Sequence, residues 1–180
     1  IEGLLWFVIG LFKKVIIADK LAVLANATFN NSMYITFFDA WFGTIAYTLQ
    51  LYFDFSGYSE MAIGLGLMLN FKLPLNFNRP YRAVSIIDFW KRWHITLSTF
   101  LKNYLYIPLG GNRTGNHLRN IMITMSLGGL WHGASWTFII WGVIHGVFIC
   151  LNHLWRKTGL KIPLLLSWII TFNVVCLDIF

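Results

Sequence analysis

The sequence is poor in charge, and this absence argues against an ordinary soluble domain. Only 12% of its 180 residues are charged, whereas a soluble domain usually carries about 25%. No Lys, Arg, Asp or Glu lies between Arg119 and Arg156, and none lies between Lys161 and Asp178. A membrane-spanning helix needs about 20 mostly apolar residues. The hydrophobic content of 57% and the mean hydropathy of +0.64 therefore predict several spans of an all-α membrane protein.

The sequence also has few cysteines and no pair of histidines at a spacing typical of metal ligands. Cys150 and Cys176 both lie in apolar segments and suggest neither a disulfide framework nor a ligand pair. None of the five histidines forms an HxxH or HxxxH pair, so no metal site and no bound cofactor is expected. The chain begins at Ile1 and ends at Phe180 inside an apolar run. We therefore expect residues 1–180 to be a fragment of a single membrane domain.

Acidic residues are outnumbered by basic ones, 7 against 14, which leaves a net charge of +7. The basic residues gather beside apolar segments, as they do on the cytoplasmic flanks of membrane spans, where they also meet anionic lipid. The three groups are Lys13, Lys14 and Lys20; Lys72, Arg79, Arg82, Lys91, Arg92 and Lys102, continued by Arg113 and Arg119; and Arg156, Lys157 and Lys161. A chain this apolar offers no basic groove, so membrane lipid is expected as a partner and nucleic acid is not.

The first part of the chain predicts helices separated by one loop. Residues 3–12 are apolar but too short to span a bilayer, so they form the end of a span or an interfacial piece. The asparagine-rich residues 21–38 predict a loop. Residues 40–71 are apolar apart from two acids, and a straight helix of that length would overshoot a hydrocarbon core of about 30 Å. Gly57 is the expected position of a bend or break.

Two prolines within residues 72–85 predict a second loop. Ser85 and Asp88 have the spacing of an N-terminal capping box, and Asp88 can pair with Arg92 one turn later. Bulky apolar side chains then recur at helical spacing. The pattern predicts an amphipathic helix around residues 86–106 that lies in the membrane interface.

The last part of the chain predicts further spans of a polytopic helical bundle. Residues 120–155 are too long for one straight span, and small residues at 128–129 and 133–135 soften its middle. Two helices, or one broken helix, are expected there, packed closely through these small residues. Residues 162–180 predict another span after a proline.

His132 is the first candidate for chemistry. It lies in the uncharged stretch, at about mid-membrane depth if the helix begins near Asn120. Ionisable groups there are costly and usually face the protein interior or a cavity, and a neutral imidazole can act as a general base. Gly133 leaves room for a substrate to approach, and Trp131 could form one wall of the substrate site. The alternative is a structural histidine that bonds to a neighbouring helix.

Two more histidines share apolar surroundings. His94 falls near the apolar face of the predicted interfacial helix, which is unusual for a surface histidine. The simpler interpretation is a hydrogen bond to a backbone carbonyl. His145 is also expected inside the membrane, and an interhelical hydrogen bond is its simpler interpretation.

Two acids stand within the apolar segment 40–71 and require partners there. On a helix Asp54 faces Tyr58, and Ser56 faces Glu60, each pair one turn apart. Pairing with Arg79 or Arg82, lining a polar tunnel and relaying protons all remain open as roles, and a purely structural charge pair is an equally open interpretation.

Three runs of sequence carry a family resemblance. They are YFDFSGYSEMAIGLGLMLNF, NRPYRAVSIIDFWKRWHITLSTFLKNYLYIPLGGNR and SLGGLWHGASWTFIIWGVIHG. In order and spacing they resemble the membrane-bound O-acyltransferases (MBOAT) over residues 10–155. The similarity is closest to the bacterial branch that includes alginate O-acetylation, and teichoic-acid D-alanylation is a more distant relative. The resemblance implies a many-helix bundle around a tunnel through the bacterial cytoplasmic membrane, with multiple passes.

The resemblance also implies roles for individual residues. The family's essential histidine matches His132, and its second functional position matches His94. His132 would take a proton from the attacking hydroxyl, and His94 would orient the donor or stabilise the oxyanion. The acidic and Arg-Pro motifs match Asp54, Glu60 and Arg79. The full set of tunnel candidates is Asp54, Ser56, Tyr58, Glu60, Arg79, Trp131 and His145.

The function expected from this resemblance is O-acyl transfer, most simply of an acetyl group. An acyl thioester such as acetyl-CoA would donate from the cytoplasm. A hydroxyl of a cell-surface polysaccharide such as alginate would accept, directly or through periplasmic acetylation proteins. Three alternatives stay open: D-alanyl transfer to teichoic acid, a proton-coupled transporter that uses the acids and histidines, and a scaffold that docks periplasmic enzymes.

Overall fold

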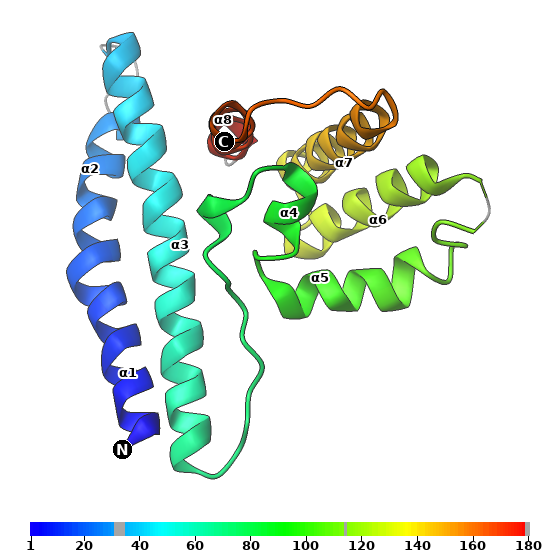
Figure 1. Cartoon of the computed structure of the whole chain (residues 1–180). Coiled ribbons are helices and arrows are strands. Elements are labelled where there is room, and N and C mark those ends of the chain that lie inside the picture. The colour runs from blue at the N-terminus through cyan, green and yellow to red at the C-terminus, as the bar shows by residue number, and fades with distance from the viewer. Residues whose placement is uncertain (31–34, 114, 179–180) are drawn as a thin grey trace. The chain divides into compact units, whose positions relative to one another are not determined.

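The structure is a computed structural model that describes residues 1–30, 35–113 and 115–178 (Figure 1). Every regular element within these residues is a helix, which confirms the expected all-α class. The chain divides into two compact units, Ile1–Asn76 and a second that begins at Phe77, each with its own internal packing.

The first unit is a pair of long antiparallel helical runs (Figure 1). The helix α1 (Glu2–Phe12) continues through the π-helical segment η1 (Lys13–Ala18) into α2 (Asp19–Asn30). The whole run packs along α3 (Phe37–Met68). The start of α3 is capped by Thr36, whose hydroxyl accepts a hydrogen bond from the Asp39 amide. Apolar residues that look too short to span a membrane are thus the first turns of a much longer helical run.

Two predictions for the first unit are wrong. The expected loop at residues 21–38 is helical up to Asn30, because packing against α3 outweighs the weak helix propensity of asparagine; residues 31–34 of that loop lie outside the described residues. The break expected at Gly57 is absent, and α3 runs uninterrupted over 32 residues. Gly57 serves close packing instead of bending.

Four glycines let α1 and α3 touch backbone to backbone. A Cβ atom added at Gly57 would lie 2.7 Å from the carbonyl oxygen of Gly10, and one added at Gly10 would lie 2.5 Å from that of Gly57. Gly3 and Gly64 are in the same relation two helical turns away. A Cβ atom added at Gly3 would lie 2.7 Å from the Gly64 carbonyl oxygen, and one added at Gly64 would lie 2.6 Å from that of Gly3. Cβ atoms essentially never approach other atoms that closely. No side chain larger than hydrogen fits at these positions without moving a helix.

The second unit contains the remaining helices. In chain order they are η2 (Pro80–Arg82), α4 (Ile86–Trp90), α5 (Ile95–Leu101), η3 (Lys102–Tyr106), α6 (His117–His132), α7 (Trp136–Lys157) and α8 (Leu164–Asp178). The helices α6 and α7 pack against each other as a hairpin (Figure 1). The short helix α4 contacts α7 and α8, and its Phe89 is buried among the aromatic rings of Tyr81 and Trp93.

The single amphipathic helix expected over residues 86–106 is wrong in one respect, because it breaks between α4 and α5. Its N-terminus is as predicted: the Ser85 hydroxyl accepts from the Asp88 amide at 3.1 Å, and Asp88 pairs with Arg92 at 2.9 Å. The break falls at His94, whose φ of +41° is left-handed and cannot occur within a right-handed helix. The carbonyl of Arg92 accepts a hydrogen bond from the Asn78 amide, which ties the break to the preceding loop.

The helix pair predicted for residues 120–155 is confirmed. The helix α6 ends at His132, and α7 begins at Trp136 after a three-residue break. Gly129 and Gly142 face each other where the two helices cross, with backbone in direct contact. His132 therefore lies at the end of α6, next to the short non-helical segment between α6 and α7, and not in the middle of a continuous span.

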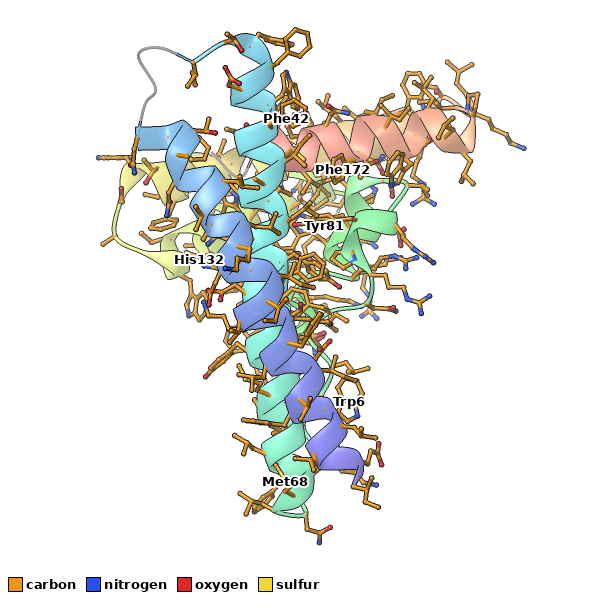
Figure 2. All side chains as sticks on the ribbon, turned by 90° about the vertical axis from the view of Figure 1, so that its left-hand side faces the viewer. Trp6, Phe42, Met68, Tyr81, His132 and Phe172 are labelled. Atoms are coloured by element: carbon orange, nitrogen blue, oxygen red, sulfur yellow. The ribbon has the colours of Figure 1, made fainter. Side chains whose placement is uncertain are left out.

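The described surface is unusually apolar. Large hydrophobic side chains are exposed along α1, α3, α7 and α8, and Phe42 and Met68 are labelled examples in Figure 2. Among the described residues, α7 is the one helix whose length and composition suffice to cross a membrane. The apolar helix α8 has 15 described residues, a length of about 22 Å against a core of about 30 Å.

Candidate active site

His132 is presented at the open end of α6. Its side chain is exposed, and Gly133 continues the chain in an extended conformation. A Cβ atom at Gly133 would lie 2.6 Å from the ring of Phe138, so any larger residue there would displace that ring. After the break, Ser135 caps α7 by accepting a hydrogen bond from the Thr137 amide. The local sequence thus ends one helix, starts the next and leaves the imidazole accessible between them.

Aromatic side chains hold His132 on one side. Its ring stands edge-to-face with Trp141 at 5.2 Å, and Trp141 stands edge-to-face with His145 at 4.6 Å. Trp90 of α4 completes the group, with its ring 5.0 Å from His145 and 5.9 Å from Trp141. We call these four residues the histidine–tryptophan cluster. Trp141 contacts His132 from within the cluster, and Phe138 stacks with the same imidazole at 6.3 Å, while the His132 side chain remains exposed.

Trp131 and His145 take opposite positions around this cluster. Trp131 is exposed and lies 5.1 Å from the His132 ring, where it can border an approaching molecule. His145 is buried beneath Trp90 and Trp141. His145 therefore supports the rings that contact His132 and is itself shielded from solvent.

His94 lies in the turn between α4 and α5 and is half-buried. Its Nδ1 atom is 3.5 Å from the hydroxyl of Thr96. Burial lowers the pKa of the His94 ring, and the nearby His132 lowers it further. The ring is consequently neutral at pH 7, and the two histidines lie close enough to interact electrostatically.

Arg79, like His94, has a backbone in the left-handed conformation with a positive φ angle. Its φ is +47°, directly before the buried Pro80 that starts η2. Left-handed backbone at residues other than glycine costs about 1–3 kcal/mol and clusters at functional sites. The hydrogen bond between Asn78 and Arg92 joins the segments that carry the two strained residues. Both positions belong to the motif singled out in the sequence.

A cavity of about 260 Å³ lies in the second unit behind the cluster. Trp90, Leu101 and Met125 form part of its largely apolar wall, and Lys102 and Tyr106 contribute polar atoms. The indole Nε1 of Trp90 is buried with no hydrogen-bond partner among the described residues. An unsatisfied donor beside a cavity indicates room for a polar group of a bound molecule.

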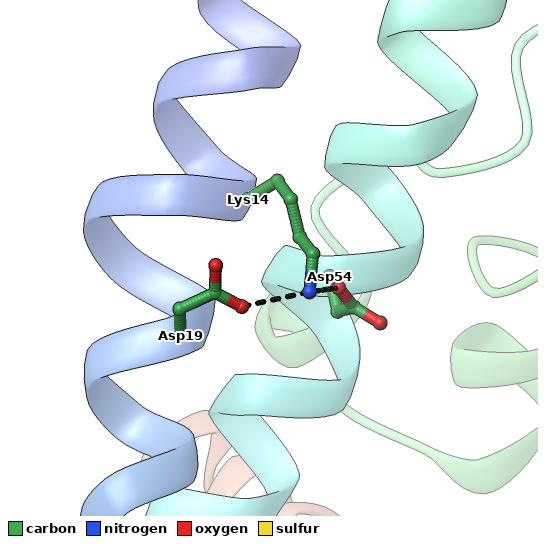
Figure 3. A network of polar contacts seen from close by, with 3 residues as sticks. All are labelled: Lys14, Asp19 and Asp54. Atoms are coloured by element: carbon green, nitrogen blue, oxygen red, sulfur yellow. Dashed lines mark hydrogen bonds and ion pairs between the residues drawn. The ribbon is translucent and has the colours of Figure 1, made fainter.

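The acidic candidates form a separate group in the first unit. The Lys14 ammonium lies 2.7 Å from Asp54 and 2.7 Å from Asp19, and Figure 3 shows it between the two carboxylates. Lys13 forms an ion pair with Glu60. Two consecutive lysines of η1 are therefore the ion-pair partners of these acids, which agrees with a structural charge pair.

The remaining tunnel candidates on α3 differ in exposure. Ser56 is buried and its hydroxyl has no partner among the described residues, whereas Tyr58 is exposed. The geometry thus divides the predicted site: His132, His94 and His145 gather in the second unit, and the acidic motif pairs with lysines in the first. Within the described part of the chain, no three His, Cys, Asp or Glu side chains gather as metal ligands.

Two members of the cluster were not singled out by sequence reasoning. Trp141 precedes His145 by four residues, a spacing that places both on one helix face, so the sequence held a signal for this contact. Trp90 is one of the bulky apolar residues of the helix predicted around residues 86–106 and was not proposed for the site. Its contact with Trp141 and His145 joins two distant segments of the chain, which the spacing of apolar residues does not reveal.

The comparison with known families decides the identity of the chain. The profile of the family described as MBOAT, membrane-bound O-acyltransferase, matches residues 2–174. The chain belongs to this family. Membership agrees with the resemblance of the three sequence runs, and it extends that resemblance to α1 and most of α8. An MBOAT chain is membrane-bound, in agreement with its exposed apolar surface and with α7.

Curated relatives of this MBOAT chain include acetyl and alanyl transferases. It is 54% identical over 179 residues to a peptidoglycan O-acetyltransferase of Helicobacter pylori, covering 96% of the chain and 34% of that protein. A probable alginate O-acetylase of Pseudomonas aeruginosa is also 54% identical, covering 97% of the chain and 34% of that protein. A teichoic acid D-alanyltransferase of Streptococcus thermophilus is 32% identical, covering 73% of the chain and 38% of that protein. The chain spans about a third of the length of the two O-acetylation relatives.

Proposed function

We propose that the protein to which this chain belongs transfers an acyl group, most simply acetyl, from a thioester to a hydroxyl. The observation that carries the proposal is the placement of His132. It is accessible at a helix end, held by Trp141 on one side, and part of a chain of the membrane-bound O-acyltransferase family. An accessible imidazole held by neighbouring aromatic rings suits a general base.

The proposed chemistry uses His132 as the proton carrier. Its neutral imidazole accepts the proton of the acceptor hydroxyl while the hydroxyl oxygen attacks the thioester carbonyl carbon. The tetrahedral intermediate collapses, the carbon–sulfur bond breaks, and the thiolate leaves with the proton that His132 returns. A positioned base of this kind contributes about 10²–10⁴-fold to the rate. An ester and a free thiol result, so atoms and charge balance.

His94 is proposed to assist as a neutral hydrogen-bond donor. Its half-buried ring lies near His132, and the donor thioester or the developing oxyanion is the group it would contact. The strained backbone at His94 and Arg79 supports a functional placement of this segment. The cavity behind Trp90 would take part of the donor molecule.

The acyl group and acceptor are proposed from the relatives. The two relatives at 54% identity are named for O-acetylation, whereas the alanyl transferase is 32% identical. Acetyl transfer is therefore favoured over D-alanyl transfer. Acetyl-CoA or another acyl thioester would be the donor, and the acceptor would be a hydroxyl of alginate, another exopolysaccharide or peptidoglycan. Periplasmic acetylation proteins would receive the acetyl group where transfer is indirect.

The membrane arrangement is proposed in the same way. The chain would form part of a single polytopic domain in the bacterial cytoplasmic membrane, with the segment around residues 86–106 at the interface. The ion pairs of Asp54 and Glu60 with lysines favour a structural role for these acids over a proton path. The transporter alternative thereby loses its main support.

The test is acetylation of cell-surface polysaccharide in a strain whose own copy is deleted and replaced by variants. His132→Ala is expected to lower acetyl ester content by at least about 100-fold, because the general base is lost. Trp6→Ala is the control, since Trp6 lies on α1 in the first unit and is not part of the cluster or of the cavity behind Trp90. Immunoblotting of membranes confirms equal abundance. Undiminished acetylation in the His132 variant would overturn the proposal.

A further inference from the structure

A second cavity lies at the C-terminal end of α7, where that helix meets α8 and the start of α4. Its volume is about 250 Å³, close to that of the cavity behind Trp90, but its lining is different. The polar and aromatic residues that line it are Ser85, Asn152, Trp155, Arg156, Ser167 and Thr171. None of them belongs to the candidate active site, so the cavity needs its own explanation.

The charge in this cavity is basic. Arg156 lines it, and none of the ion pairs found among the described side chains involves Arg156. Lys157 and Lys161 follow within five residues and add to the positive potential. A guanidinium binds a phosphate group through two parallel hydrogen bonds, which makes arginine the usual residue for this ligand.

Two polar residues of the cavity, Ser85 and Asn152, can donate to an anion, whereas the hydroxyls of Ser167 and Thr171 already donate to the carbonyls of Ile162 and Ser167. The Ser85 hydroxyl accepts from the Asp88 amide, so its own proton remains free to donate. The amide oxygen of Asn152 is buried with no partner among the described residues, and a side-chain amide can turn to donate instead. The carbonyl of Trp155 is already bonded twice by Thr158, which reduces its repulsion of an anion. Buried polar groups left without protein partners indicate a missing ligand.

The position along α7 indicates where such an anion comes from. The helix α7 is the candidate membrane span, and its last turn carries Trp155, Arg156 and Lys157. Tryptophan and basic residues at the end of a span mark the depth of the lipid headgroups. We infer that this cavity binds the phosphate of an anionic membrane phospholipid, with Arg156 as the main contact and Ser85 and Asn152 as further contacts. This inference does not depend on the proposed acyl transfer.

Native mass spectrometry of the purified protein in detergent tests the inference. Phosphatidylglycerol is titrated into the wild-type protein, Arg156→Gln and Arg119→Gln. The Arg156 variant is expected to need about ten-fold more lipid for half-occupancy, because one charge-assisted contact is lost. Arg119→Gln removes the same charge from an exposed position on α6 outside the cavity and is expected to bind like the wild type. Asn152→Ala is expected to weaken binding less, in the same direction.

Four results would overturn the inference. Unchanged lipid occupancy in Arg156→Gln would remove the contact on which it depends, and an equal loss in both arginine variants would show general charge attraction. Equal binding of phosphatidylcholine would show no preference for anionic lipid. Displacement of phosphatidylglycerol by millimolar inorganic phosphate would assign the cavity to a soluble phosphate instead. Size-exclusion profiles of all variants exclude misfolding, and Asn152→Ala reports on the same cavity independently of the charge.

Discussion

The backbone at His94 has a φ of +41°, a conformation that asparagine adopts more readily than most other side chains. This permits a substitution that keeps the turn and removes the titrating ring. Because burial lowers the pKa of His94 in the folded state, the unfolded chain binds more protons just below pH 6.5. The folded state is therefore destabilised as the pH falls through that value and on toward the lowered pKa.

We predict that His94→Asn flattens the acid side of the stability profile. Thermal unfolding in detergent between pH 5 and pH 7.5 measures it. The variant should lose less stability than the wild type as the pH falls from 6.5, with little difference at pH 7.5. Parallel profiles for the two proteins would show that His94 is equally protonated in both states. His94→Ala, which tolerates the turn less well, should be less stable than His94→Asn at every pH.

Trp141 lies between the exposed His132 and the buried His145 of the cluster. Its indole contacts His132 at 5.2 Å and His145 at 4.6 Å. We predict that Trp141→Ala lowers acyl transfer by up to about 100-fold at equal membrane abundance, since a displaced base costs that much. Trp141→Phe should retain more activity because one ring remains. Trp6→Ala, in the other unit, should leave the rate unchanged, and a loss in that control would point to a general defect.

At the scale of elements, the contact between α1 and α3 depends on glycine. We predict that Gly57→Ala lowers the free energy of unfolding by about 1–3 kcal/mol through the clash with the Gly10 carbonyl. Gly128→Ala is the matched control, since its Cβ meets only the two methyl groups of the Leu101 side chain, at 3.0 and 3.9 Å. Both changes gain the same helix propensity, about 1 kcal/mol. The difference between their melting curves in detergent isolates the clash, and equal curves would contradict it.

The elements also show what the sequence can and cannot reveal. The end of α6 at His132 was predictable, because glycine and small residues weaken a helix locally. The uninterrupted α3 was not, since Gly57 has the same local signature as a break and only the neighbouring α1 explains it. The lysine partners of Asp54 and Glu60 also depend on the position of η1 beside α3. Contacts between distant segments are set by packing and leave little trace in local spacing.

At the scale of the whole molecule, the exposed apolar surface predicts an integral membrane protein. Large hydrophobic side chains project from both units, as Figure 2 shows for the described residues. Water would order around this surface at a high free-energy cost, so it must be covered by lipid or protein. Membership of a membrane-bound family was foreseen from motifs, whereas composition alone already required the membrane.

We predict that the protein stays in the membrane pellet after washes with 1 M salt and with alkaline carbonate, and that detergent releases it. Salt screens the attraction of basic groups for anionic lipid but leaves hydrophobic burial intact. Release by salt would instead indicate surface attachment through the basic residues. A peripheral protein of the same membranes serves as the washing control, and an immunoblot of pellet and supernatant measures the distribution.

The reciprocal glycines have a consequence for inheritance. A one-base change in a glycine codon either keeps glycine or gives a codon for a larger residue or a stop, so every missense change at Gly3 or Gly64 adds atoms where a backbone already lies. A second change at the opposite glycine cannot compensate, because it also adds atoms. We therefore expect natural substitutions to be rare at these glycines and more frequent among the exposed apolar side chains, where one apolar residue replaces another at little cost in stability.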